Sequence, residues 1–241
     1  MPTMNTASKY FNRIHLYLTL QSVVVILLSI NRLSSLTTGY VAANQFLRWV
    51  DFHNMLTLPL ITLVVLQLLK QHVESNSTTS NIFSHRLANL VFVIGIYFFG
   101  AGYGDHEITN YLHIRYCPQG VGNDLCRIVI FNDDEFSHWI WFAGFTLLNV
   151  TLLWIQALFV APTAMRRGDK VGIVINSLFI ALGIFANLGF EPIGLDLYIV
   201  ALLAVVSIGL LWRKGQQPLF IYYSVAYTLG LIATGIVKLV R

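Results

Sequence analysis

The chain has 241 residues, of which 56% are hydrophobic and 11% are charged, and its formal net charge is +4. Soluble domains carry about 25% charged residues, so this composition excludes a soluble globular fold. The basic residues form no stripe of the kind that binds nucleic acid, which excludes that class of partner as well. We expect a single membrane domain over residues 1–241, with membrane lipid as its main partner.

Seven apolar stretches are long enough to cross a bilayer, since a hydrocarbon core of about 30 Å needs roughly 20 residues in a helix. They lie at residues 15–40, 47–69, 86–104, 136–160, 171–188, 195–211 and 219–239. Lipid leaves unpaired backbone groups unsatisfied, so each stretch must be helical. Alternating strands of about ten residues, the signature of a barrel, are absent. The sequence therefore predicts an all-α fold, a polytopic bundle of seven transmembrane helices.

The distribution of charge predicts the orientation of this bundle. Nine of the fifteen Lys and Arg residues lie on the N-terminal side and six on the opposite side. Because basic residues favour the cytoplasmic face, we expect the N-terminus inside and the C-terminus outside, in a plasma or inner membrane. Residues 1–8 contain no cationic segment or cleavage site, so we expect no signal peptide and a first helix that itself directs insertion.

The two cysteines lie in the longest predicted connection, residues 114–133, which this orientation places outside. Cys117 and Cys126 are the only cysteines of the chain. An even number of cysteines in an oxidising compartment indicates a disulfide, here one that closes a short loop. Two unpaired thiols are the alternative, because spacing alone does not establish disulfide geometry.

Four histidines gather at the predicted outer ends of three helices. His53 begins the second helix, His106 and His113 follow the third, and His138 begins the fourth. If the third helix continues, His106, Asn110 and His113 share one stripe of its surface. The remaining histidines, which are scattered over the inner side, are expected to be interfacial: His15, His72 and His85.

Acidic residues accompany these histidines. Asp51 precedes His53 by two residues, and Asp134 and Glu135 precede His138 by four and three. Glu-x-x-His is a spacing used by metal ligands on helices. Imidazole and carboxylate groups together suit zinc, and also iron or manganese.

We therefore expect a divalent metal site, with zinc favoured over iron and manganese. Its candidate ligands, not all used at once, are His53, His106, His113 and His138. Asp51, Asp134 and Glu135 are candidates for a ligand, a general base or an orienting group. Two other interpretations stay open: a solvated polar rim, and a pathway for protons or ions.

The function that this pattern favours is a metal-dependent membrane hydrolase acting on a lipid or amphiphile at the outer leaflet. One alternative is a non-enzymatic binding or accessory protein that docks through residues 114–133. Another is a transporter coupled to small ions or protons.

Seven helices with His and Asp residues at one face resemble the superfamily of alkaline ceramidases and adiponectin-type receptors, which are zinc-dependent membrane hydrolases. That family has an H-x-x-x-H pair in its last helix, whereas this chain has no histidine after His138. The resemblance consequently assigns a role to none of the residues above.

Overall fold

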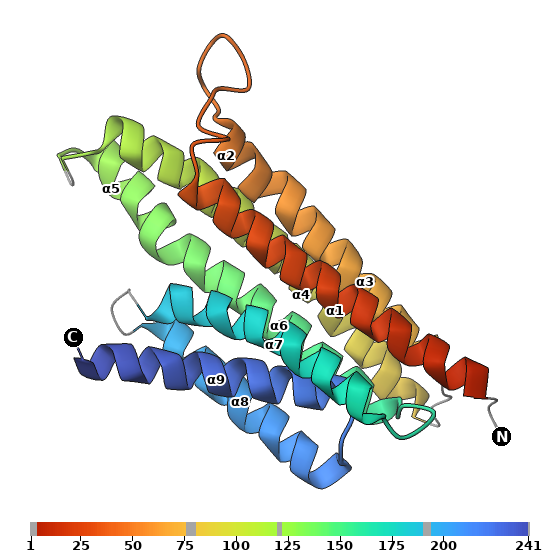
Figure 1. Ribbon diagram of the computed structural model, residues 1–241. Coiled ribbons are helices and arrows are strands. Elements are labelled where there is room, and N and C mark those ends of the chain that lie inside the picture. The colour runs from red at the N-terminus through yellow and green to blue at the C-terminus, as the bar shows by residue number, and fades with distance from the viewer. Residues whose placement is uncertain (1–3, 76–80, 120–121, 190–193, 241) are drawn as a thin grey trace. The chain divides into compact units, whose positions relative to one another are not determined.

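A computed structural model describes residues 4–75, 81–119, 122–189 and 194–240, and side chains from residue 8 onward. This part of the chain is helical apart from its connections and one isolated bridge between Tyr40 and Arg48. The helices, traced in Figure 1, are α1 (Met4–Leu33), α2 (Trp49–Phe52), η1 (His53–Thr57), α3 (Leu58–Ser75), α4 (Ile82–Tyr116), α5 (Asp124–Phe131), η2 (Asn132–Phe136), α6 (Ser137–Leu158), α7 (Arg167–Leu188), α8 (Leu195–Lys214) and α9 (Pro218–Val240). The predicted all-α fold is confirmed.

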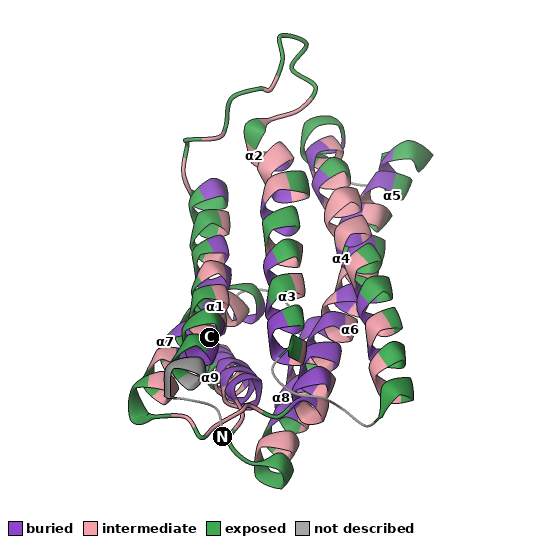
Figure 2. Ribbon diagram, turned by 90° about the vertical axis from the view of Figure 1, so that its right-hand side faces the viewer, coloured by how far each residue is buried: buried purple, intermediate pink, exposed green. Residues whose placement is uncertain are grey.

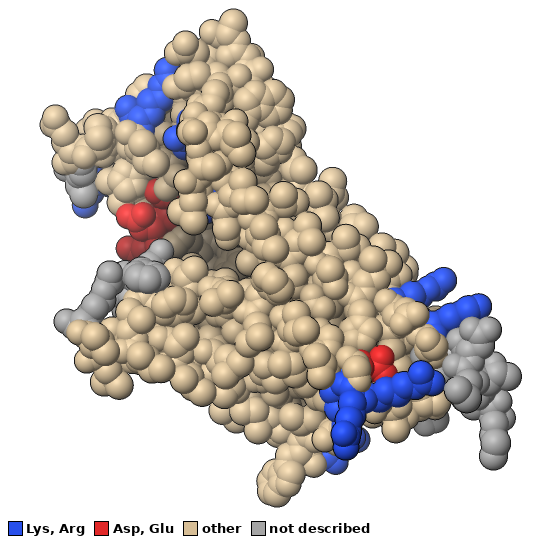
Figure 3. Space-filling view, in the orientation of Figure 1, with Lys and Arg blue, Asp and Glu red and all other residues tan. Residues whose placement is uncertain are grey.

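The described residues contain seven helices that are long and apolar enough to cross a membrane. Two of these spans are composite, because α2, η1 and α3 are continuous, as are α5, η2 and α6. Their exposed faces (green in Figure 2) include large apolar side chains such as Leu60, Val93 and Val205. Most of the surface seen in Figure 3 carries neither acidic nor basic side chains.

The first helix ends at Leu33, seven residues earlier than the prediction of 15–40. The residues that follow are rich in Ser and Thr, whose hydroxyls bond to nearby backbone and so compete with the helix. Thr37 Oγ1 donates to the carbonyl of Asn31 at 3.2 Å, and Thr38 Oγ1 donates to that of Ser35 at 3.0 Å.

The prediction of a loop over residues 114–133 is wrong for most of its length. Helix α4 continues to Tyr116, and α5 and η2 are helical from Asp124 onward. Asn123 caps α5 by accepting a hydrogen bond from the Cys126 backbone N–H at 2.9 Å, which explains where this helix begins. Residues 120–121 lie outside the described residues.

The predicted disulfide is present. It joins Cys117 to Cys126 across a Cα–Cα distance of 5.6 Å. Both cysteines are buried, together with Val129, and Leu112 packs against them. The disulfide therefore ties the end of α4 to the first turn of α5.

The chain forms two compact units, and α1, α3, α4 and α6 each contribute to both. The first unit comprises residues 1–25, 65–90 and 149–241. In it, α9 packs against both α7 and α8 (Figure 1). Its core includes Ile14, Leu152 and Phe220, all fully buried. A buried hydrogen bond of 2.8 Å from Ser22 Oγ to Asn176 Oδ1 joins α1 to α7.

The second unit comprises residues 26–64 and 91–148, and it contains all the predicted site residues. Here α4 and α6 approach closely at two glycines. A Cβ on Gly144 would lie 2.2 Å from the backbone nitrogen of Phe99, and one on Gly102 would lie 2.6 Å from the Cα of Trp141. Only glycine permits such an approach, which brings the histidines of α4 next to the acids that precede α6.

Candidate metal centre

Asp133 lies at the centre of the polar groups in the second unit. Its buried carboxylate faces a stripe of α4: His113 Nδ1 lies 2.8 Å from Oδ2, and His106 Nδ1 lies 3.2 Å from Oδ1. Asn110 Nδ2, on the same stripe, donates to Oδ2 at 3.4 Å. A buried carboxylate is costly unless it is paired, and these three side chains provide its partners.

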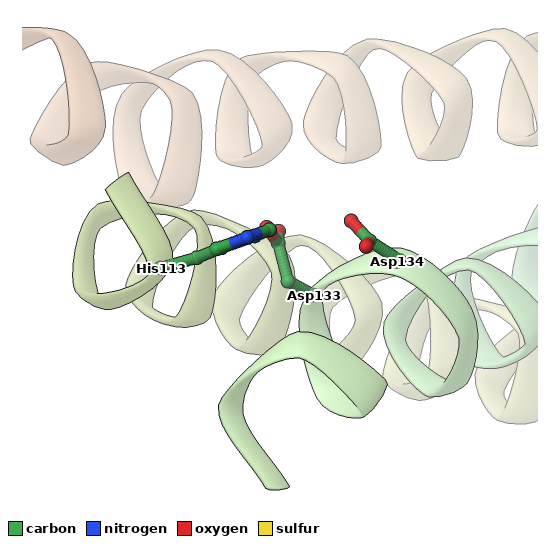
Figure 4. Close-up of side chains that lie close together, drawn as sticks. All are labelled: His113, Asp133 and Asp134. Atoms are coloured by element: carbon green, nitrogen blue, oxygen red, sulfur yellow. The ribbon is translucent and has the colours of Figure 1, made fainter. Parts of the chain in front are cut away.

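Asp134 and His138 complete what we call the His–Asp cluster: His106, His113, Asp133, Asp134 and His138. One donor atom each from His113, Asp133 and Asp134 lies within 4.8 Å of the others. Figure 4 shows how these three side chains lie close together. The ring centroid of His138 is 5.0 Å from that of His106. Asp133 is buried and His113 half-buried, whereas Asp134 is exposed, so the group is open to solvent on one side.

A π-helical turn gives the two aspartates their position. η2, from Asn132 to Phe136, interrupts the span between α5 and α6. A π-helical turn contains one residue more than an α-helical turn, and such turns are frequent at functional sites. Ser137 Oγ donates to the Asp133 carbonyl at 2.9 Å, which satisfies a backbone acceptor at this interruption. The turn thereby directs Asp133 toward α4.

The contacts of Asp133 define which histidine nitrogens are available to a metal. His113 Nδ1 hydrogen-bonds to Oδ2 of the carboxylate, whereas His106 Nδ1 lies 3.2 Å from Oδ1 and hydrogen-bonds to the Asp133 backbone carbonyl at 3.3 Å. When Nδ1 carries the proton and donates it to Asp133, Nε2 keeps its lone pair for a ligand. This carboxylate–histidine arrangement orients the imidazoles of many metal sites. Asp133 can thus act as a ligand itself or hold the two rings in place.

A second polar network connects three spans of the same unit. Arg32 of α1 forms an ion pair with the buried Glu107 of α4. The other oxygen of Glu107 accepts from Asn54 Nδ2 at 3.3 Å, and Asn54 Oδ1 accepts from Asn31 Nδ2 at 2.7 Å. Of these side chains Asn31, Asn54 and Glu107 are buried, and each has a polar partner within the network, as buried polar groups require.

Asp51 lies in an ion pair instead of the His–Asp cluster. Both of its carboxylate oxygens accept from Arg48, through Nε and Nη2, at 2.7 Å. These hydrogen bonds raise the pKa of the Arg48 guanidinium above its ordinary value. The guanidinium also lies over the ring of Tyr111, with Cζ 5.2 Å from the centroid.

Two of the predicted site residues remain, His53 and Glu135. His53 Nδ1 lies 3.1 Å from Thr57 Oγ1, and its ring stacks on Trp49, so its contacts lie within its own span. Glu135 follows Asp134 in η2 and is exposed. The structure thus brings together His106, His113, His138 and Asp134, while Asp51 and His53 have partners elsewhere.

Several site residues were absent from the sequence-based candidates, Asp133 above all. Asp133 and Asp134 are adjacent in the sequence, and without the π-helical turn nothing indicates which of them is buried. Asp105 was also missed; its Oδ2 is buried and accepts no hydrogen bond within the described part of the chain. Asn31 and Arg32 interrupt an otherwise apolar helix, a signal that could have identified them.

Comparisons with protein families, with curated proteins and with solved structures give no match.

Proposed function

We propose that this chain is a membrane-embedded, metal-dependent hydrolase that acts on a lipid or amphiphilic substrate. The observation that carries the proposal is that one potential ligand atom each from His113, Asp133 and Asp134 lies within 4.8 Å of the other two. Carboxylates and imidazole are the ligands that divalent zinc, iron and manganese share, and zinc is the expected ion. With the orientation inferred from the basic residues, this metal centre faces outward.

The ligand set favours catalysis over a purely structural metal site. Three protein ligands leave a coordination position for water, and a bound divalent cation lowers the pKa of that water toward neutrality. The exposure of Asp134 leaves the site accessible from solvent. His106 and His138 lie beside the three ligands and supply further imidazole groups for a ligand or a hydrogen bond.

Hydrolysis also needs a group that moves a proton. When an ester or amide is hydrolysed, the water oxygen bonds to the carbonyl carbon and the bond to the leaving group breaks. One water proton passes to the leaving group. Two carboxylates next to the ligands are suited to carry that proton, the exposed Glu135 and the half-buried Asp105. Asp105 is the stronger candidate, because its buried Oδ2 lacks a hydrogen-bond partner among the described residues.

Metal analysis of the purified protein tests the proposal. Protein reconstituted with Zn²⁺ and then freed of excess ion should retain about one metal per chain by elemental mass spectrometry. His113→Ala and Asp133→Asn should each lose most of it. His15→Gln is the matched control, because this histidine pairs with Asp169 in the first unit and should leave metal content unchanged.

Full metal content in both variants contradicts the proposed metal site. A second measurement tests the reaction: fatty acid release from vesicles that contain glycerolipid esters and an N-acyl amide. Release should require the metal and fall at least about a hundredfold in Asp133→Asn, the scale of losing a metal-site residue. Release that persists after chelation contradicts a metal-dependent mechanism.

A further inference from the structure

The second unit also contains a polar pocket of about 280 Å³, lined in part by Asn31, Arg32, Arg48, Asp51 and Glu107. We propose that this pocket binds an uncharged, hydroxyl-bearing headgroup, of the glycerol or sugar type. The assignment of this ligand as the headgroup of the substrate rests on the proposed function. The binding site itself does not depend on that function.

The charges around the pocket favour an uncharged ligand. Two guanidiniums and two carboxylates line it, and each guanidinium is already paired with a carboxylate: Arg32 with Glu107 and Arg48 with Asp51. Both carboxylates are buried. An anionic or cationic ligand would have to separate one of these pairs and leave a buried charge without its partner, which is strongly unfavourable. A neutral ligand leaves both pairs intact.

The hydrogen-bonding groups of the pocket favour hydroxyls in particular. Asn31 is 7% exposed, and its Oδ1 is a buried acceptor without a hydrogen-bond partner among the described residues. Its Nδ2 is already occupied, donating to the Val50 carbonyl at 3.0 Å and to Asn54 Oδ1 at 2.7 Å. Asn31 lines the pocket, so a ligand hydroxyl that reaches its amide could donate to Oδ1 and accept from a neighbouring donor at the same time. An unsatisfied buried acceptor is costly, so such a ligand gains affinity by pairing it.

Asn110 connects the pocket to the His–Asp cluster. It lines the pocket, and its Nδ2 donates to Asp133 Oδ2 at 3.4 Å. A headgroup in the pocket therefore has its linkage to the acyl chain close to the proposed metal ligands. The volume lies just below the usual range of ligand pockets, roughly 300–1,000 Å³, so it suits a headgroup and leaves the apolar chain in the membrane.

Three probes with the same hexyl chain and different headgroups test this inference. The protein is placed in phosphatidylcholine nanodiscs and titrated calorimetrically with 1-O-hexylglycerol, whose ether cannot be hydrolysed, with hexyl phosphate and with hexyltrimethylammonium. Hexylglycerol should bind saturably, and at least about tenfold more tightly than the two charged probes, a difference equivalent to one paired hydrogen bond to a buried acceptor.

Two variants assign this binding to the pocket. Asn31→Leu removes the free acceptor at nearly constant volume and should weaken hexylglycerol binding about tenfold. Ser34→Phe fills the pocket from its lining and should abolish binding without removing an ion pair. Asn44→Ser is the matched control, because Asn44 is exposed and absent from the lining. Should Asn31→Leu not fold, Ser34→Phe decides the question.

Tighter binding of either charged probe, or unchanged hexylglycerol binding in Ser34→Phe, overturns the inference. Metal content measured on the same samples separates this failure from that of the proposed function. Hexylglycerol binding without a metal site contradicts the hydrolase and supports the pocket. A metal site without hexylglycerol binding contradicts the pocket alone.

Discussion

The Oδ2 atom of Asp133 lies 2.8 Å from Nδ1 of His113, and this contact joins α4 to the π-helical turn before α6. The carboxylate is buried, while both of its histidine partners are only half-buried. Asp133 therefore has a structural role as well as the chemical role proposed for it.

Asp133→Asn should lower the stability of the protein by about 2 kcal/mol, because it weakens hydrogen bonds to a buried charged group. For a chain of this size the melting temperature should fall by about 5 °C, measured by tryptophan fluorescence in nanodiscs. Asp134→Asn is the comparison, since this exposed neighbour should change stability by less than about 0.5 kcal/mol. Equal melting temperatures for the two variants would contradict the central position of Asp133.

Gly144→Ala should destabilise the protein by about 1–3 kcal/mol, because the added Cβ would lie 2.2 Å from the Phe99 backbone and force α4 and α6 apart. Gly100→Ala is the matched control on α4, where an added Cβ meets nothing within 4 Å. That control should gain up to about 1 kcal/mol from its higher helix propensity. Opposite shifts in melting temperature are expected, and a stable Gly144→Ala would be inconsistent with the close approach of the two helices.

Replacing both cysteines by serine should lower stability by about 3 kcal/mol, the loop-closure contribution of a disulfide over a short segment. The bond spans a sequence separation of nine residues between the end of α4 and α5. Reduction of the wild-type protein should produce a similar loss. The measurement is thermal unfolding with and without reductant, and no effect of reductant on the wild type would mean that the disulfide does not stabilise this region.

A double-mutant cycle tests the coupling of Arg48 and Asp51. It compares Arg48→Met, Asp51→Leu and the double variant. Arg48→Met should cost about 3–5 kcal/mol, because it leaves the buried Asp51 carboxylate without its partner. The double variant Arg48→Met, Asp51→Leu should recover most of that loss, since it removes the unpaired charge as well. Additive effects of the single variants would show that the two side chains are not coupled.

The number of spans and the disulfide follow directly from the sequence. The first depends on long runs of apolar residues, and the second on the pairing of the only two cysteines, Cys117 and Cys126. The common stripe of His106, Asn110 and His113 could also be predicted, because it needs only that α4 continues.

The partners of that stripe could not be predicted. Asp51 and His53 have the same residue types and the same place beside a helix end as Asp134 and His138. What distinguishes them is Arg48, which occupies both carboxylate oxygens of Asp51, and Thr57, which lies against His53. Which partner a side chain takes depends on distances in the folded structure, and these cannot be inferred from the residue types alone.

The π-helical turn at Asn132–Phe136 makes the cluster depend on the number of residues as well as on their identities. Consecutive residues of an α-helix are rotated by about 100°. A relative that lacked one residue between Asp133 and Ser137 could retain every histidine and carboxylate and still point Asp133 away from α4. When homologous chains are compared, the length of this short segment is therefore as informative about the metal centre as the presence of its ligands.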